Sequence, residues 1–170
     1  MGKFKNAYIF KVCIILLTSV LLLCTTSCKK VDAYSDFERI TYNEILNQKA
    51  DQDGKYFVII YSTTCTYCEQ LEPTVVKYQN FVLSHKFFGY KYPPVYVLNI
   101  NAAENKDIKA SDSEYKNFTG TNNYKEIKFQ TAPAFIEVTN GTVSTLISSK
   151  VTNYPVTEVE ILLNKIMNEE

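Results

Sequence analysis

The sequence predicts an α/β fold in which a mixed central β-sheet carries helices on both faces. Two observations predict it. Segments with helical periodicity alternate with strand-like runs along the first half of the chain, and two strand-like runs near the end are separated by Asn140-Gly141. Strands connected through helices pair in parallel, whereas an Asn-Gly turn joins antiparallel strands. The sheet is therefore expected to be mixed.

Each element is predicted from its own pattern. Apolar residues at helical spacing predict helices, and runs of aromatic and β-branched residues predict strands. In chain order the expected elements are a helix at 36–49, a strand at 56–61, a helix at 66–88, a strand at 95–100, a polar and partly helical segment at 103–128, strands at 133–139 and 142–148, and a helix at 157–168.

The composition is that of a globular protein, and its charge does not indicate nucleic-acid binding. Hydrophobic residues make up 46% of the 170-residue chain and charged residues 21%, which is typical of a folded domain. The formal net charge is zero, so the excess of basic residues that nucleic-acid binding requires is missing. We therefore expect no nucleic acid among the partners.

The N-terminal segment predicts export from the cytoplasm. Lys3, Lys5 and Lys11 precede an apolar run from Val12 to Cys24, and this run is shorter than the roughly 20 residues that span a bilayer. We expect a signal peptide at 1–27, a tether at 28–35 and one folded domain at 36–170.

The end of this segment resembles the lipobox of bacterial lipoproteins. The small residue Ser27 lies directly before Cys28. The resemblance implies that Cys28 is lipidated and anchors the chain to the cell membrane. An uncleaved anchor and an ordinary cleaved signal are the alternatives. All three place the remainder of the chain outside the cytoplasm, where disulfides form and persist.

Cys65 and Cys68 are the candidate catalytic residues. The other three cysteines fall in the export segment, and this pair follows an expected buried strand and begins an expected helix. Unpaired N–H groups and the helix dipole favour a thiolate at Cys65. Cys68 is close enough to resolve a mixed disulfide. A structural disulfide and half of a zinc site are the alternatives, although His85 is the only histidine, and we expect no metal.

Two stretches of the chain resemble the thioredoxin family. Phe57–Pro73 (FVIIYSTTCTYCEQLEP) is similar to the family's strand, Cys-x-x-Cys and helix, and Thr131-Ala132-Pro133 precedes a strand–turn–strand hairpin as in the family. The resemblance implies a thioredoxin-like fold with an insertion between the active-site helix and a cis Ala132–Pro133 bond. It also implies substrate binding by Tyr67, Ala132 and Pro133.

The predicted function is that of an extracytoplasmic, membrane-anchored disulfide oxidoreductase. Its substrates are protein thiols and disulfides, it needs no cofactor, and an unidentified redox partner recycles the cysteine pair. The sequence departs from thioredoxins at Ile59, where the family has a buried acid, and the direction of electron flow stays open. The alternative is a redox-inert binding lipoprotein with the same fold, of the kind that accompanies bacteriocin export.

Overall fold

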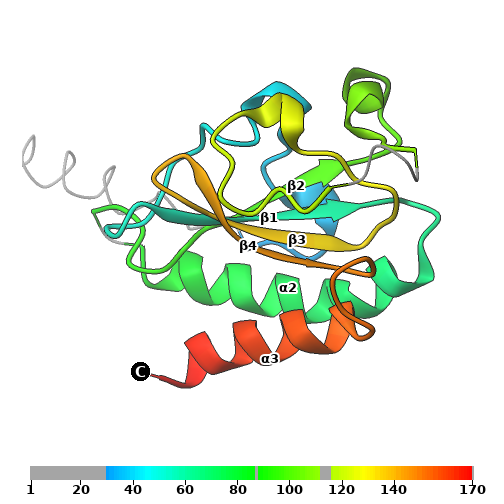
Figure 1. Ribbon diagram of the computed structural model, residues 1–170. Coiled ribbons are helices and arrows are strands. Elements are labelled where there is room, and N and C mark those ends of the chain that lie inside the picture. Colours follow the sequence, from blue (N-terminus) through cyan, green and yellow to red (C-terminus); the bar gives the residue numbers. More distant parts are fainter. Residues whose placement is uncertain (1–29, 87, 112–115, 170) are drawn as a thin grey trace, which may run out of the picture.

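The computed structural model describes residues 30–86, 88–111 and 116–169. The expected signal peptide at 1–27 and the lipidation site Cys28 lie outside the described residues. Within the described part, four strands form one sheet in the order β2-β1-β3-β4 (Figure 1). The strands are β1 (Lys55–Tyr61), β2 (Val95–Asn99), β3 (Ala134–Thr139) and β4 (Thr142–Ser148).

The sheet is mixed, as the sequence predicts. β1 pairs with β2 in parallel, whereas β1 with β3 and β3 with β4 are antiparallel. Asn140 and Gly141 form the turn between β3 and β4, and both have a positive φ. β1 lies in the interior of the sheet, and every residue of it after Lys55 is buried. Its last residue leads directly into the segment that carries the two cysteines.

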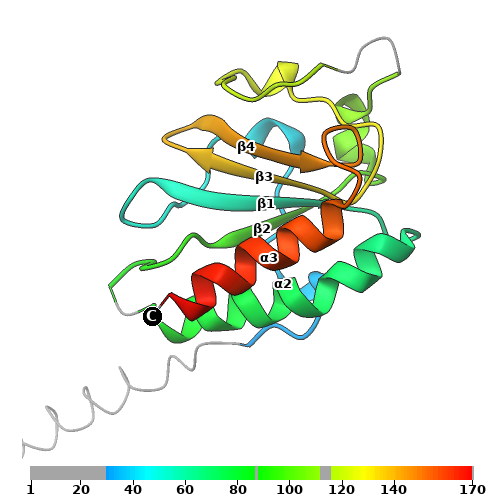
Figure 2. The same cartoon turned by 60° about the horizontal axis from the view of Figure 1, so that its bottom comes forward.

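Two α-helices cover one face of the sheet. α2 (Thr66–Ser84) and α3 (Pro155–Asn168) lie side by side against it (Figures 1 and 2). Alternate residues of β1, among them Phe57 and Ile59, belong to the apolar cluster on this face. Phe57 and Phe135 meet at 4.9 Å between ring centroids, which centres the cluster on the middle of the sheet.

The opposite face is covered by short 3₁₀ helices and loops rather than by α-helices. η2 (Tyr42–Glu44), η3 (Ala103–Ile108) and η4 (Tyr124–Glu126) lie on this side. Their apolar residues pack on the alternate residues of the strands, such as Val58 and Ile60. The segments between α2 and Pro133, where the sequence suggests an insertion, supply most of this cover.

The helix expected at 36–49 is wrong. Instead the chain forms 3₁₀ turns on either side of Arg39, which bridges Val97 of β2 in parallel. The apolar residues that suggested a helix serve both faces of the sheet: Phe37 packs with the α2 side and Ile40 with the other. A segment that passes the edge of a sheet can therefore carry apolar spacing similar to that of a helix.

The boundaries of other elements also differ from those expected. α2 ends at Ser84 rather than at residue 88, and α3 begins two residues early, with Pro155 in its first turn. The described part of the segment expected as a tether is packed. Val31 and Tyr34 are buried, and the side chain of Asn80 on α2 hydrogen-bonds both backbone groups of Val31. Packing of the domain thus begins before residue 36.

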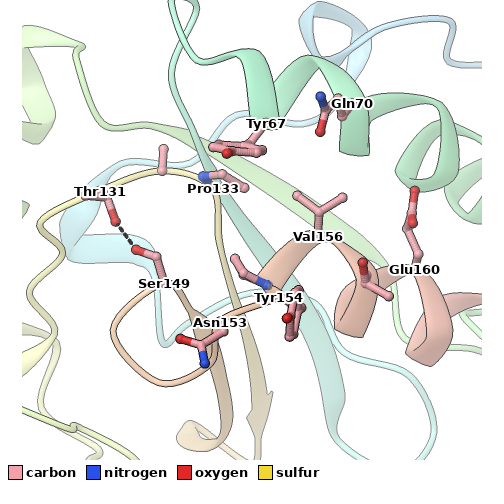
Figure 3. Close-up of a pocket in the computed structure, with 12 residues that line it drawn as sticks. Tyr67, Gln70, Thr131, Pro133, Ser149, Asn153, Tyr154, Val156 and Glu160 are labelled. Atoms are coloured by element: carbon pink, nitrogen blue, oxygen red, sulfur yellow. Dashed lines mark hydrogen bonds between the residues drawn. The ribbon is translucent and has the colours of Figure 1, made fainter.

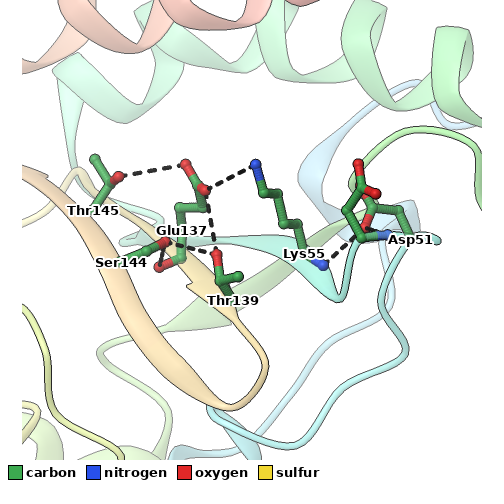
Figure 4. Close-up of polar contacts among 7 residues, drawn as sticks. Asp51, Lys55, Glu137, Thr139, Ser144 and Thr145 are labelled. Atoms are coloured by element: carbon green, nitrogen blue, oxygen red, sulfur yellow. Dashed lines mark hydrogen bonds and ion pairs between the residues drawn. The ribbon is translucent and has the colours of Figure 1, made fainter.

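The end of the sheet farthest from the cysteines is closed by polar contacts. Glu137 of β3 faces Lys55 at 4.0 Å and accepts hydrogen bonds from Thr139 and Thr145 (Figure 4). The backbone N–H of Lys55 donates to the carboxylate of Asp51 at 2.8 Å. These contacts secure the turn that precedes β1.

Candidate active site

Cys65 caps the N-terminus of α2. Its backbone is extended, and its sulfur accepts a hydrogen bond from the N–H of Cys68 at 3.2 Å. Its carbonyl oxygen accepts from the N–H groups of Cys68 and Glu69. The sulfur therefore lies at the positive end of the helix and accepts a hydrogen bond from an N–H group of its first turn. This position suits a nucleophilic thiolate.

A segment from far along the chain meets this cysteine. The Ala132–Pro133 peptide is cis, as the thioredoxin resemblance implies. The carbonyl oxygen of Ala132 accepts a hydrogen bond from the sulfur of Cys65 at 3.2 Å. The pairing of β3 with β1, which sets Ala134 opposite Ile60, brings the two segments together.

The two cysteines are free thiols in different surroundings. Cys68 is 2% exposed, whereas Cys65 is only partly buried. Burial, reinforced by a hydrogen bond with Cys65, raises the pKa of Cys68 to about 12. Cys65 is therefore the more accessible sulfur of the pair, and Cys68 lies inside the fold.

A groove of about 690 Å³ extends away from this junction. Figure 3 shows Tyr67 of α2 beside Pro133, with Tyr154 and Val156 at the start of α3 facing them. The hydroxyls of Thr131 and Ser149 are hydrogen-bonded at 2.7 Å across the wall of the groove. Tyr67 is 64% exposed, so its ring is available to a bound chain.

The structure thus places five of the residues singled out from the sequence together: Cys65, Tyr67, Cys68, Ala132 and Pro133. The groove adds residues that sequence reasoning missed, namely Gln70, Ser149, Asn153, Tyr154, Val156 and Glu160. A signal for part of this set was present. The Asn-Gly turn fixes the register of the hairpin, and this register pairs Ser148 with Ala134, so the loop after β4 must lie beside Pro133.

The described residues show no site for a metal ion and no membrane-spanning helix. No group of three or more His, Cys, Asp or Glu side chains gathers in residues 30–86, 88–111 and 116–169. In the same ranges no helix combines the length and the apolar character needed to cross a bilayer.

Three features decide the fold. The sheet has one parallel and two antiparallel pairings in the order β2-β1-β3-β4, the thiols begin the helix that follows the central strand, and a cis proline faces them. The protein has a thioredoxin-like fold. Its site lies where the end of β1, the start of α2 and the start of β3 converge.

Comparisons with known proteins find only distant structural neighbours. No protein-family model matches the chain, and no curated protein matches its sequence. Among solved structures, Chlamydomonas reinhardtii thioredoxin f2 is 16% identical, with a TM-score of 0.49 over 76% of this chain and 94% of that one. Mitochondrial thioredoxin 3 from Saccharomyces cerevisiae is 14% identical, with a TM-score of 0.42 over 74% and 97%. Thioredoxin f from spinach chloroplast (long form) is 15% identical, with a TM-score of 0.45 over 75% and 85%.

Proposed function

We propose that this protein is a membrane-anchored, extracytoplasmic protein disulfide oxidoreductase. The observation that carries the proposal is the contact of the Cys65 sulfur with the carbonyl of Ala132, 3.2 Å away and next to the cis proline. It puts the more accessible thiol beside backbone groups that can hold a client. Cys68 lies deeper in the fold, and its backbone N–H donates a hydrogen bond to the sulfur of Cys65.

The chemistry is two successive thiol–disulfide exchanges. The Cys65 thiolate attacks one sulfur of a client disulfide, a bond forms between the two sulfurs, and the client's own S–S bond breaks to release one thiol. Cys68, as a thiolate, then attacks the sulfur of Cys65 and expels the second client thiol. The client gains two electrons and two protons, and the protein is left with a Cys65–Cys68 disulfide. Run in reverse, the same steps oxidise a client dithiol.

The groove supports a protein client rather than a small thiol. Its walls come from α2, from the segment before β3 and from the start of α3, and the exposed ring of Tyr67 flanks it. An extended client segment beside Pro133 can present its cysteine to Cys65 while neighbouring residues occupy the groove. A second dithiol protein then restores the redox state of the pair.

The N-terminal segment supports action outside the cytoplasm. The basic start, the apolar run and Cys28 together predict export, with a lipid at Cys28 as the anchor. Val31, only three residues later, already packs on α2. With so little chain between lipid and domain, we expect the domain to work close to the membrane surface.

A trapping experiment tests the function and the location together. Cys68→Ser removes the resolving thiol, so clients should accumulate as disulfide-linked adducts of Cys65. Intact cells that express the full chain are quenched with a membrane-impermeant alkylating reagent, and adducts are identified by mass spectrometry. The Cys65→Ser, Cys68→Ser double variant is the matched control, because it keeps the three N-terminal cysteines. If adducts appear equally in both variants, the oxidoreductase proposal fails.

A binding module without turnover is the second candidate. The observation that favours it is Ile59, which is fully buried where thioredoxins have an acid. Such a module would hold a peptide segment in the same groove. A strain that carries only Cys65→Ser separates the two functions. Binding alone survives this change, whereas disulfide exchange does not.

A further inference from the structure

Another cavity lies beside Cys68. It shares no lining residue with the groove, although α2 contributes residues to both. It measures about 300 Å³, and its lining includes Tyr34, Arg39, Tyr61, Cys68, Glu69 and Glu72. A space of this volume with polar walls has room for water. The exchange chemistry proposed for Cys68 assigns no role to this cavity.

Tyr34 contributes an unusual polar group to this cavity. The residue is 5% exposed, and its hydroxyl is buried without a hydrogen-bond partner in the described part of the chain. The ring is held in place, because it packs on Tyr61 at 5.0 Å and on Phe37 at 5.9 Å between centroids. Burial raises the pKa of Tyr34 far above its ordinary value, and Cys68 and Glu72 add to the shift. The hydroxyl therefore keeps its proton and is available as a hydrogen-bond donor.

Glu72 contributes a carboxylate to the lining of the same cavity. One of its carboxylate oxygens accepts a hydrogen bond from the backbone N–H of Tyr34. Glu72 also follows Cys68 by four residues on α2, which sets their Cβ atoms about 6 Å apart on one side of the helix. The cavity thus brings together a buried thiol, a neutral hydroxyl and a carboxylate.

Cys68 needs such a neighbour to act. Its thiol must lose a proton before it can attack a mixed disulfide, yet its pKa is raised to about 12 by burial. Ile59, on the same face of the sheet, is apolar and offers no acceptor. Arg39 and Glu69 line the cavity as well, and the charge of Glu69 makes ionisation of Cys68 harder.

We infer that this cavity is the proton-transfer site of the resolving step, in which Glu72 accepts the proton of Cys68 through a water molecule held by the hydroxyl of Tyr34. The inference rests on the proposed function. The proton leaves the sulfur of Cys68 for the water, and the water passes one of its own protons to the carboxylate. The resulting thiolate forms the bond to Cys65 and expels the client thiolate, which then takes up a proton. Tyr34 stays protonated throughout and acts as a positioning residue.

The test measures the two exchange steps separately. Reduced full-length protein is mixed with an excess of a model peptide disulfide at several pH values between 6 and 9. Samples are quenched with acid, and the mixed disulfide is counted by mass spectrometry. Tyr34→Phe and Glu72→Gln should each slow resolution about tenfold or more, while formation of the mixed disulfide keeps its rate. The mixed disulfide should therefore accumulate in both variants, and the rise of the resolving rate with pH should begin at higher pH.

Two control variants separate this role from simpler ones. Tyr42→Phe removes another buried hydroxyl, on the opposite face of the sheet, that has no hydrogen-bond partner in the described part of the chain. This variant should resolve at the wild-type rate. Glu69→Gln removes a negative charge close to Cys68 and should resolve at least as fast as wild type. If Glu72 were only another nearby charge, Glu72→Gln would accelerate resolution in the same way. The sign of its effect therefore decides between a proton acceptor and a bystander.

Each outcome has one meaning. Slower resolution in both Tyr34→Phe and Glu72→Gln supports the inference, and an unchanged or faster rate in either variant overturns it. Both substitutions preserve shape, and the amide oxygen of Gln can still accept the N–H of Tyr34, so urea unfolding should confirm intact folds. If Cys65 forms no mixed disulfide at all, the proposed function itself fails, which is a different result from normal formation followed by normal resolution.

Discussion

The polar groups at the two ends of β1 differ in how they are hydrogen-bonded. At the Lys55 end, charged and polar side chains contact one another, and the carbonyl of Gly54 accepts a hydrogen bond from the N–H of Asn140 at 2.9 Å. At the Tyr61 end, two thiols are free, and the hydroxyl of Tyr34 is buried without a partner among the described residues. The polar side chains at the Lys55 end are paired with one another, whereas the Tyr61 end holds two thiols and a buried hydroxyl that makes no hydrogen bond among the described residues.

This difference indicates where stability and chemistry reside. A buried polar group without a partner costs about 1–3 kcal/mol of stability, so a fold tolerates it only where the rest of the structure compensates. The apolar clusters on both faces of the sheet and the contacts at the Lys55 end provide that compensation. We therefore expect substitutions at the Tyr61 end to alter reactivity and those at the Lys55 end to alter stability.

The largest expected effect is a difference in alkylation between the two thiols. Burial raises the pKa of Cys68 to about 12, so its thiolate is scarce at pH 8. Iodoacetamide at pH 8 should therefore label Cys65 and leave Cys68 unmodified, as assigned by peptide mapping with mass spectrometry. Because an acid with a raised pKa ionises only as the pH approaches that value, labelling of Cys68 should increase toward pH 12.

Unfolding supplies the control for this selectivity. In concentrated urea both cysteines lose their surroundings, and each ionises near the ordinary thiol pKa of about 8.5. The two sites should then be labelled to the same extent. Equal labelling in the native protein would contradict the assignment of Cys65 as the accessible sulfur.

The next effect is a loss of stability at the opposite end of the strand. Gly54 has a φ of +76°, and a Cβ there would lie 2.1 Å from the side-chain oxygen of Asn140. Gly54→Ala should lower the free energy of unfolding by about 1–2 kcal/mol from the left-handed backbone, plus the cost of moving Asn140. Urea denaturation measures the loss, and the exchange rate of the folded protein should not change.

Gly120→Ala is the matched control. Gly120 also has a positive φ, of +91°, but nothing lies within 4 Å of a Cβ added there. This variant isolates the backbone contribution, so Gly54→Ala should be the less stable of the two. Equal stabilities would show that Asn140 moves aside freely and that the turn before β1 is not tightly packed.

The sequence predicts most of the sheet because local patterns determine it. The run Tyr56–Tyr61 is apolar throughout because β1 is covered on both faces, and Asn140-Gly141 encodes the hairpin through backbone conformations that few other residues adopt. The Cys-x-x-Cys motif directly follows this run and indicates the start of α2. Each of these signals lies within a few consecutive residues.

What the sequence failed to predict depends on contacts between distant segments. The apolar residues Phe37 and Ile40 look like one face of a helix, yet they end on opposite faces of the sheet, because Arg39 bridges β2 between them. Tyr34 lies in a segment expected to be a tether, and only its packing against Tyr61 shows that it faces the Cys68 cavity. Local periodicity contains no information about either placement.

The smallest expected effect is a pH-dependent gain in stability from Asp51, next to the turn at the Lys55 end. Burial raises the pKa of Asp51, although its carboxylate accepts hydrogen bonds from the N–H groups of Lys55 and Asp53. A carboxyl group whose pKa is higher in the folded state favours folding when protonated, and this contribution is lost as the pH rises through that pKa. At pH 7 the ionised group therefore lowers the free energy of unfolding slightly.

Asp51→Asn keeps the accepting oxygen without the charge and should raise the free energy of unfolding at pH 7 by about 0.5 kcal/mol or less. In urea titrations the gain should vanish at pH 3, where the wild-type carboxyl is protonated in both states. A gain of the same size at both pH values would mean that the charge of Asp51 is not its cause, and that the contacts at this end of β1 stabilise the fold through their hydrogen bonds alone.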